Sequence, residues 1–244
     1  MTGYAWAQDG ARMALVAGVT AAFAALGYAV RGVNRSGAVA GAVVCFALFA
    51  AAGPGGFAAL LAVFVITWIA TRVGRARKVR LGTAERGEGR RASQVLANLG
   101  VASGCAALYA VRGESLWLVA MAAAMAEAAA DTVSSELGQA FSRRALLITS
   151  LETVPPGTDG GISIRGTASG VLAATLVGAV CAAAGLIPQR SAAIAAVAGV
   201  AGMLVDSLLG ACFERARQMS NDAVNFAGTI TAAVVGALVA GWRG

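Results

Sequence analysis

The chain has 244 residues, of which 58% are hydrophobic and 13% are charged, and its formal net charge is +7. A soluble globule of this length needs far more polar residues to cover its surface, so this composition excludes a water-soluble domain. The chain contains no histidine, which excludes nucleophilic schemes with a histidine base and metal sites with histidine ligands. We therefore expect a single all-α integral membrane domain over residues 1–244.

Eight apolar stretches are long enough to cross the hydrocarbon core of a bilayer, which is about 30 Å thick. In chain order they are 11–30, 36–52, 55–73, 93–111, 114–138, 166–187, 191–213 and 222–242. The second stretch is short and joins the third through Gly53-Pro54-Gly55, so a re-entrant hairpin or a single broken span would reduce the number to seven. The Gly-Pro-Gly turn favours two separate spans.

The basic residues distribute unevenly between the two sides that eight crossings define. One side holds 31–35, 72–92, 139–165 and 214–221, and the other holds both termini and the short turns. The basic residues divide 15 against 4: Arg31, Arg35, Arg72, Arg75, Arg77, Lys78, Arg80, Arg86, Arg90, Arg91, Arg143, Arg144, Arg165, Arg215 and Arg217 against Arg12, Arg112, Arg190 and Arg243. The positive-inside rule then predicts that the first side is cytoplasmic and that both termini are non-cytoplasmic, in an inner or plasma membrane.

Topology also explains most of the basic charge. Because the charge lies in short loops, we expect no nucleic-acid partner. The basic loop at about 72–92 is expected to contact anionic membrane lipids, and the second cytoplasmic loop is at about 139–165.

Acidic side chains lie inside two of the expected spans. Asp131 and Asp206 each precede the cytoplasmic end of a span by about seven residues, which is roughly 10 Å of depth. Ionisable groups in spans are costly and mark function by default, and oxygen ligands without histidine or thiolate suit Mg²⁺. Asn98 and Asn225 enter from the same side at comparable depth. The structural alternative is that Asp206 and Asn225 only form hydrogen bonds between helices.

Two further acids lie on the same span as Asp131. Glu127 is one turn deeper on the same helix face, and we expect it to pair with an arginine or to be protonated, outside the metal ligands. Glu136 lies roughly 140° round the helix from Asp131. It reaches the metal only if the helix end unwinds, and otherwise it faces the cytoplasmic rim.

The segment 154–167 is an irregular run of Pro, Gly and Thr between two apolar stretches. Its glycines allow positive φ and close backbone approach, and the start of the following helix favours an anion. The segment therefore predicts a phosphate site, although a tight connection between helices also uses Gly and Pro. Thr158, Ser163, Arg165 and Thr167 add hydroxyl groups and a positive charge, which favour the phosphate interpretation.

Six ordered segments cover nearly the whole chain. They are GRRASQVLAN at 89–98, DTVSSELG at 131–138, LITS at 147–150, the run 154–167, DSLLGA at 206–211 and NDAVNF at 221–226. Together they resemble the motifs of the polytopic membrane family that includes the plastid phytyl-phosphate kinase of vitamin E biosynthesis. Two positions depart from that pattern, with Val133 in place of the usual Trp and Leu99 in place of the usual Gly.

The resemblance implies Mg²⁺-dependent transfer of a phosphoryl group from CTP to a prenyl monophosphate, such as phytyl or geranylgeranyl phosphate. A phosphate monoester is already an anionic nucleophile, so this reaction needs alignment and charge neutralisation rather than a histidine base. On this interpretation Mg²⁺ is held by Asp131, Glu136 and Asp206. The expected phosphate contacts are Gly157, Thr158, Asp159, Gly160, Gly161, Ser163, Thr167, Asn98, Asn221 and Asn225, and Arg165 neutralises the transferred charge.

Two other functions use the same residues. A cytidylyltransferase-like enzyme would join CTP to a lipid phosphate, giving a CDP-lipid and pyrophosphate. A small-molecule or lipid transporter, or a lipid-binding scaffold, is the alternative of a different class, and a transporter would need polar groups through both leaflets. The outer halves of the expected spans carry almost none. The sequence leaves open the prenyl chain length, the nucleotide base and the oligomeric state, a homo-oligomer included.

Overall fold

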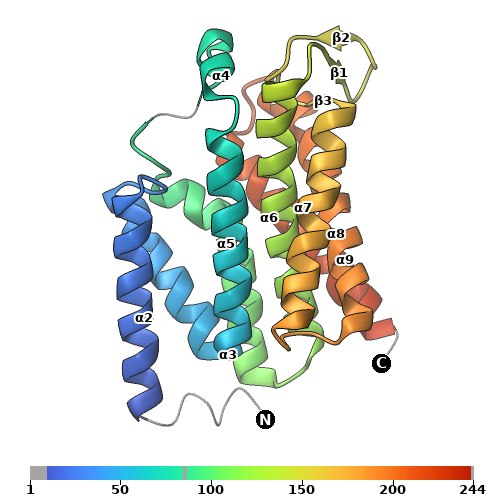
Figure 1. The fold of residues 1–244 in the computed structure, drawn as a ribbon. Helices are drawn as coiled ribbons and strands as arrows, with labels where there is room; N and C mark the ends of the chain where they lie inside the picture. Colours follow the sequence, from blue (N-terminus) through green and yellow to red (C-terminus); the bar gives the residue numbers. More distant parts are fainter. Residues whose placement is uncertain (1–9, 85–86, 243–244) are drawn as a thin grey trace.

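Long helices packed side by side make up most of the molecule (Figure 1). The structure is a computed structural model that describes residues 10–84 and 87–242, so Arg86 and Arg243 of the charge analysis lie outside the described residues. The long helices are α2 (Gly10–Ala29), α3 (Arg35–Arg72), α5 (Ala92–Arg112), α6 (Leu116–Phe141), α7 (Ile164–Ala183), α8 (Gln189–Leu209) and α9 (Asn221–Trp242). Seven helices, α8 taken together with its continuation to Glu214, are long and apolar enough to cross a membrane, which confirms the predicted polytopic helical fold.

Helix α3 covers two of the eight apolar stretches that the sequence analysis marked as possible crossings. It has 38 residues, or about 57 Å at 1.5 Å per residue, which is nearly twice the hydrocarbon thickness. Gly53 interrupts it with φ 65° and ψ −160°, a left-handed conformation that glycine adopts readily. Near the end of α3, Trp68 Nε1 donates at 3.3 Å to the carbonyl oxygen of Val30, in the short connection that leads into the start of α3. Helix α3 is therefore a helical hairpin with arms 35–52 and 54–72 (Figure 1). That each arm crosses the membrane separately stays a prediction.

The loops predicted on the basic side gather at one end of the bundle. The backbone N–H of Arg90 donates to the carbonyl of Gly32 at 3.1 Å, and the guanidinium of Arg77 donates to the carbonyl of Ser142. We call this the loop end, which comprises the described residues 30–35, 72–84, 87–92, 139–165 and 210–221. Its assignment to the cytoplasm stays a prediction.

Short elements occupy the loop end (Figure 1). They are α4 (Arg75–Leu81), β1 (Ala145–Leu147), β2 (Thr153–Val154), β3 (Gly161–Ile162) and the π-helix η1 (Gly210–Glu214). The strands form an antiparallel sheet in the order β2-β1-β3, with Ala145 opposite Val154 and Leu147 opposite Gly161. The sequence predicted only loop here, because strands of two or three residues are too short to show a period-two pattern.

Helix α6 is the central helix of the bundle, in contact with α3, α5, α7, α8 and α9. Residues 119–130 of α6 are all buried, and most of them are alanine. Small residues let its neighbours approach closely: a Cβ atom at Gly170 would lie 2.9 Å from the carbonyl oxygen of Ala130, and one at Gly199 would lie 2.9 Å from the nitrogen of Glu127. Helix α6 therefore carries its acidic residues into the middle of the bundle.

Candidate functional site

A polar cavity of about 120 Å³ lies at the loop end, between α6, α8, η1, the start of α9 and the 154–161 loop. We call it the acidic cavity. Most of the predicted site residues line it, although they come from distant parts of the sequence. They are Asp131, Gly157, Thr158, Asp159, Gly160, Gly161, Ser163, Asp206, Asn221 and Asn225.

The carboxyl groups of Asp131 on α6 and Asp206 on α8 lie within hydrogen-bonding contact of each other. Asp206 Oδ2 is buried and has no hydrogen-bond partner in the described part of the chain. Two adjacent carboxylates repel each other unless a proton or a cation lies between them, and a buried oxygen without a partner is costly. The pair is therefore arranged to take up a positively charged ligand.

The acidic cavity has an unusual charge balance for a site that is expected to bind phosphate. Four carboxylates line it, from Asp131, Asp159, Asp206 and Glu214. Neither lysine nor arginine is among the lining residues that the structure describes. A polyphosphate entering this cavity would be repelled unless cations neutralise the carboxylates.

Glu214 is a site residue that the sequence analysis missed. The expected span ended at 213, which left Glu214 in a loop. In the structure α8 continues into η1, and Glu214 lies close enough to interact electrostatically with Asp159 and Asp131. π-helical segments often occur at functional sites. The useful signal in the sequence was an acid that follows a span already containing Asp206.

The acidic residues do not form a closed metal cage. Within residues 10–84 and 87–242, no three side chains of Asp, Glu, Cys or His are grouped closely enough to hold a metal ion. Mg²⁺ usually keeps several waters and is bound through one or two carboxylates together with substrate phosphates. The adjacent pair Asp131 and Asp206, with an unpaired buried oxygen, fits that mode of binding.

The 154–161 loop lies between η1 and Thr83, the second residue after the end of α4. Gly157 and Gly160 have φ of 89° and 72°, which disfavour any side chain. A Cβ atom at Gly160 would lie 2.5 Å from the backbone nitrogen of Ala211 on η1, and one at Gly157 would lie 2.5 Å from the Thr83 side chain. Only glycine permits both contacts, so these positions bring the loop backbone to the rim of the acidic cavity.

Three predicted phosphate contacts at the start of α7 have different surroundings. Ser163 is the N-cap of α7, and its hydroxyl accepts the backbone N–H of Gly166 at 3.1 Å. Arg165 is exposed, and its guanidinium donates to the carbonyl of Phe141 at 2.8 Å. Ser163 lines the acidic cavity, whereas Arg165 and Thr167 do not.

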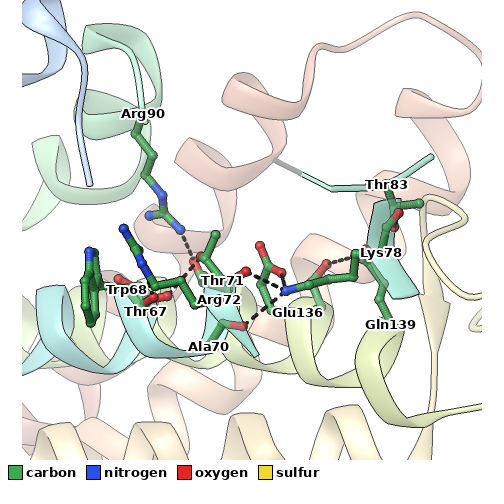
Figure 2. A network of polar contacts seen from close by, with 12 residues as sticks. Thr67, Trp68, Ala70, Thr71, Arg72, Lys78, Thr83, Arg90, Glu136 and Gln139 are labelled. Atoms are coloured by element: carbon green, nitrogen blue, oxygen red, sulfur yellow. Dashed lines mark hydrogen bonds and ion pairs between the residues drawn. The ribbon is translucent and has the colours of Figure 1, made fainter. Parts of the chain in front are cut away.

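Glu136, predicted as a magnesium ligand, is held away from the acidic cavity by an ion pair with Lys78. The Lys78 ammonium also donates to the carbonyl oxygens of Ala70 at 3.2 Å and Thr71 at 2.7 Å (Figure 2). Lys78 is only 1% exposed, although the sequence placed it in a basic loop. The ion pair therefore fixes α4 to the ends of α3 and α6.

Two more polar residues lie outside the acidic cavity. Asn98 is buried, its side-chain amide donates to the carbonyl of Gln94 at 2.9 Å, and it lines a different cavity. Glu127 is 1% exposed and lies deeper than Asp131. Both of its carboxyl oxygens lack a hydrogen-bond partner among the described residues, so the arginine partner considered from the sequence is absent there.

Comparisons with known proteins identify relatives across most of the chain. The profile of the integral membrane protein family DUF92 matches residues 18–233. The chain is 33% identical to the chloroplastic protein VTE6 of Arabidopsis thaliana over 205 residues, which are 80% of this chain and 62% of VTE6, so it spans less than two thirds of that relative. It is also 33% identical to a membrane protein of Methanocaldococcus jannaschii over 221 residues, which are 86% of each chain. A Synechocystis membrane protein is 28% identical over 193 residues, 77% of this chain and 75% of that protein. No solved structure matches the chain.

Proposed function

The chain belongs to the DUF92 family of integral membrane proteins, and we propose that it transfers the terminal phosphoryl group of a nucleoside triphosphate to a prenyl monophosphate. The product is the prenyl diphosphate, and CTP is the proposed donor. The six sequence motifs support this reaction through their resemblance to the family of the plastid phytyl-phosphate kinase. Similarity to VTE6 over most of the chain supports it further.

The observation that carries the proposal is the acidic cavity and its carboxylate pair. Asp131 and Asp206 would hold Mg²⁺, and Asp206 Oδ2 offers a buried oxygen without another partner. Bound there, Mg²⁺ would neutralise the charge of the donor phosphates. Because no lysine or arginine lines the described part of the cavity, nucleotide binding is expected to depend strictly on the metal.

The chain's own residues supply position and surroundings for the reaction. The loop that contains Gly157 and Gly160 forms one wall of the acidic cavity, and Asn221 and Asn225 on α9 also line it. Gln139 Oε1 is buried beside the loop without a hydrogen-bond partner in the described residues, so it is available to accept a hydrogen bond from bound substrate. Fixing the donor phosphates in this way provides alignment, which is the main requirement of phosphoryl transfer.

The bond changes need no protein base. An oxygen of the prenyl monophosphate attacks the γ-phosphorus of the nucleotide and forms a new P–O bond. The bond from the γ-phosphorus to the β–γ bridging oxygen breaks, and the nucleoside diphosphate leaves with that electron pair. The attacking oxygen already carries negative charge near neutral pH, which is consistent with a chain that has no histidine.

The direct test is product analysis with purified protein in detergent. We would incubate it with Mg²⁺, CTP and phytyl, geranylgeranyl and longer prenyl monophosphates, with ATP, GTP and UTP as alternative donors, and identify products by mass spectrometry. Prenyl diphosphate together with CDP is the expected result. CDP-lipid with pyrophosphate would instead identify a cytidylyltransferase, and absence of turnover by folded protein across the panel would contradict catalysis.

A further inference from the structure

A second and larger cavity of about 370 Å³ lies between α2, both arms of α3, α5 and α6, and it also reaches the loop end. We propose that this cavity binds the acceptor lipid, with one prenyl chain among its apolar side chains and the phosphate at its arginines. This assignment rests on the proposed function for the identity of the acceptor. We call it the lipid cavity.

The inner part of the lipid cavity is apolar. Val44, Leu60 and Val63 line it from the two arms of α3, and all three are at least 95% buried. Phe23 of α2 and Phe64 of α3 also line it and pack edge to face, with ring centroids 5.3 Å apart. Val44 and Leu60 lie 9 and 12 residues from the ends of α3 at the loop end, so the cavity extends roughly 14–18 Å into the bundle. A hydrocarbon chain fits these surroundings.

The outer part of the lipid cavity is basic. Arg31, Arg72, Arg75 and Arg90 line it, and none of the lining residues that the structure describes is acidic. The Arg72 guanidinium is held at the cavity wall, where it lies 3.8 Å from the centre of the Trp68 ring and donates to the carbonyl oxygens of Trp68 and Val30. Arginine guanidinium groups recognise phosphate through charge and paired N–H donors. The lipid cavity therefore attracts an anionic headgroup directly, whereas the acidic cavity requires metal.

Both cavities are lined by residues of α6 that lie within one turn of each other. Ala128 lines the lipid cavity and Asp131 lines the acidic cavity, and three residues correspond to about 4.5 Å along a helix. Arg90 bridges the same region, since it donates to the Thr132 hydroxyl at 3.2 Å and interacts electrostatically with Asp131. A phosphate held by Arg90 would therefore lie close to the carboxylate pair that is proposed to bind the donor phosphates through Mg²⁺.

The size and location of the lipid cavity favour a lipid with one chain. Its volume is near the lower end of the range for pockets that hold small ligands, about 300–1,000 Å³, which suits one hydrocarbon chain better than two. Helix α2, which forms one wall, packs against α3 at the outer edge of the bundle (Figure 1). A prenyl chain dissolved in the bilayer therefore has a short route past α2 into the cavity.

Gly41 offers a way to fill the lipid cavity without disturbing the fold. It lines the cavity from α3, and a Cβ atom there would meet nothing within 4 Å. In a Gly41→Leu variant the leucine side chain would occupy space that the prenyl chain needs. Gly104→Leu on α5 is the matched control, because a Cβ at Gly104 also meets nothing within 4 Å and Gly104 lines neither cavity.

Binding of radiolabelled geranylgeranyl monophosphate is measured without nucleotide, so that binding is separated from turnover. We expect Gly41→Leu to weaken binding at least about tenfold through steric overlap and to raise the KM for the lipid. Nucleotide binding in the presence of Mg²⁺ should be unchanged in this variant. Gly104→Leu should bind the lipid like the wild-type protein, and equal binding by both variants would overturn the assignment.

The headgroup part of the assignment has its own pair of variants on α4. Arg75→Gln removes a lining arginine and is expected to weaken binding about tenfold, as loss of a charge-assisted hydrogen bond does. Arg80→Gln removes the same charge from an exposed position outside both cavities and should have no effect. Geranylgeraniol, which lacks the phosphate, should bind more weakly than the monophosphate, and equal binding would contradict the role of the arginines.

Two further measurements do not depend on the variants. Dioleoyl phosphatidate should compete poorly, and equal competition would mean that the cavity holds an ordinary bilayer lipid. A photoreactive prenyl monophosphate should label α2 and α3 of the wild-type protein, whereas labelling confined to α7, α8 and α9 would overturn the site.

Specific lipid binding without any turnover would support the lipid cavity and contradict the kinase. Turnover that Gly41→Leu leaves unchanged would contradict the lipid cavity alone.

Discussion

Replacing Asp206 with asparagine separates a metal-binding role of the carboxylate pair from a structural one. Asp206 Oδ2 has no hydrogen-bond partner in the described residues, and the adjacent Asp131 carries a like charge. The amide has nearly the same size, removes the charge and supplies an N–H donor to Asp131. We therefore expect Asp206→Asn to fold at least as stably as wild type without Mg²⁺, while it loses metal binding and turnover.

The two expected effects differ in sign and in size. One new hydrogen bond contributes about 1 kcal/mol, which for a chain of this length raises Tm by roughly 2–4 °C. On the catalytic side, removing one group that stabilises the transition-state charge costs about 10²–10³ in kcat, or roughly 2.7–4 kcal/mol. Because Asp206 is one of the two carboxylates that are proposed to hold Mg²⁺, we expect kcat/KM to fall at least about 100-fold.

Thermal unfolding in detergent, with and without Mg²⁺, measures the first effect, and quantified prenyl diphosphate measures the second. In wild-type protein, Mg²⁺ at 100 times its Kd should add about 2.7 kcal/mol of stability, and this gain should disappear in Asp206→Asn. Glu152→Gln is the control, since Glu152 is exposed and lines neither cavity. Its Mg²⁺-dependent stabilisation and turnover should match those of wild type.

A clear loss of Tm in Asp206→Asn without Mg²⁺ would refute this reasoning. It would show that the carboxylate holds α6 and α8 together, so that a metal role is not needed to explain why an acid lies at this position. Full turnover by a folded Asp206→Asn protein would remove the metal assignment even more directly.

Three further predictions concern other parts of the loop end. Lys78→Met leaves Glu136 without its partner and should lower the stability by about 3–5 kcal/mol, measured as a lower Tm. Lys78→Met combined with Glu136→Leu should recover most of the lost stability, and a double variant as unstable as the single one would argue against the ion pair. Gly160→Ala should reduce turnover at least about tenfold by driving the loop off η1. Gly82→Ala has a similar positive φ of 73° but open space for its Cβ, so it should lose about 1–2 kcal/mol of stability and keep its activity. Glu214→Gln should raise the Mg²⁺ concentration for half-maximal activity about tenfold, and an unchanged Mg²⁺ titration would place Glu214 outside the site.

Much of the membrane fold was predictable because the information is local in sequence. The length of each apolar stretch identifies a span, and Gly53-Pro54-Gly55 identified the reversal within α3, where Gly53 has φ 65°. The sheet of β1, β2 and β3 was not predictable, because its strands pair residues that no local pattern connects.

The candidate site was predictable where a residue type was unusual for its surroundings. Asp131 and Asp206 are carboxylates inside apolar spans, and they do lie together in the structure. Glu136 shares a span with Asp131, but the helix turns it toward Lys78. Arg165 belongs to the glycine-rich run, but it points to the carbonyl of Phe141.

The sequence by itself determined that this protein is a helical membrane protein with acidic residues inside its spans, since hydrophobic length and the cost of buried charge depend on each segment alone. The tertiary structure decided which charges meet. It buried Lys78 against Glu136, brought Glu214 to the acidic cavity, and separated that cavity from one lined by Arg31, Arg72, Arg75 and Arg90. Side-chain partners depend on helix rotation and loop path, which are fixed only when all helices pack together.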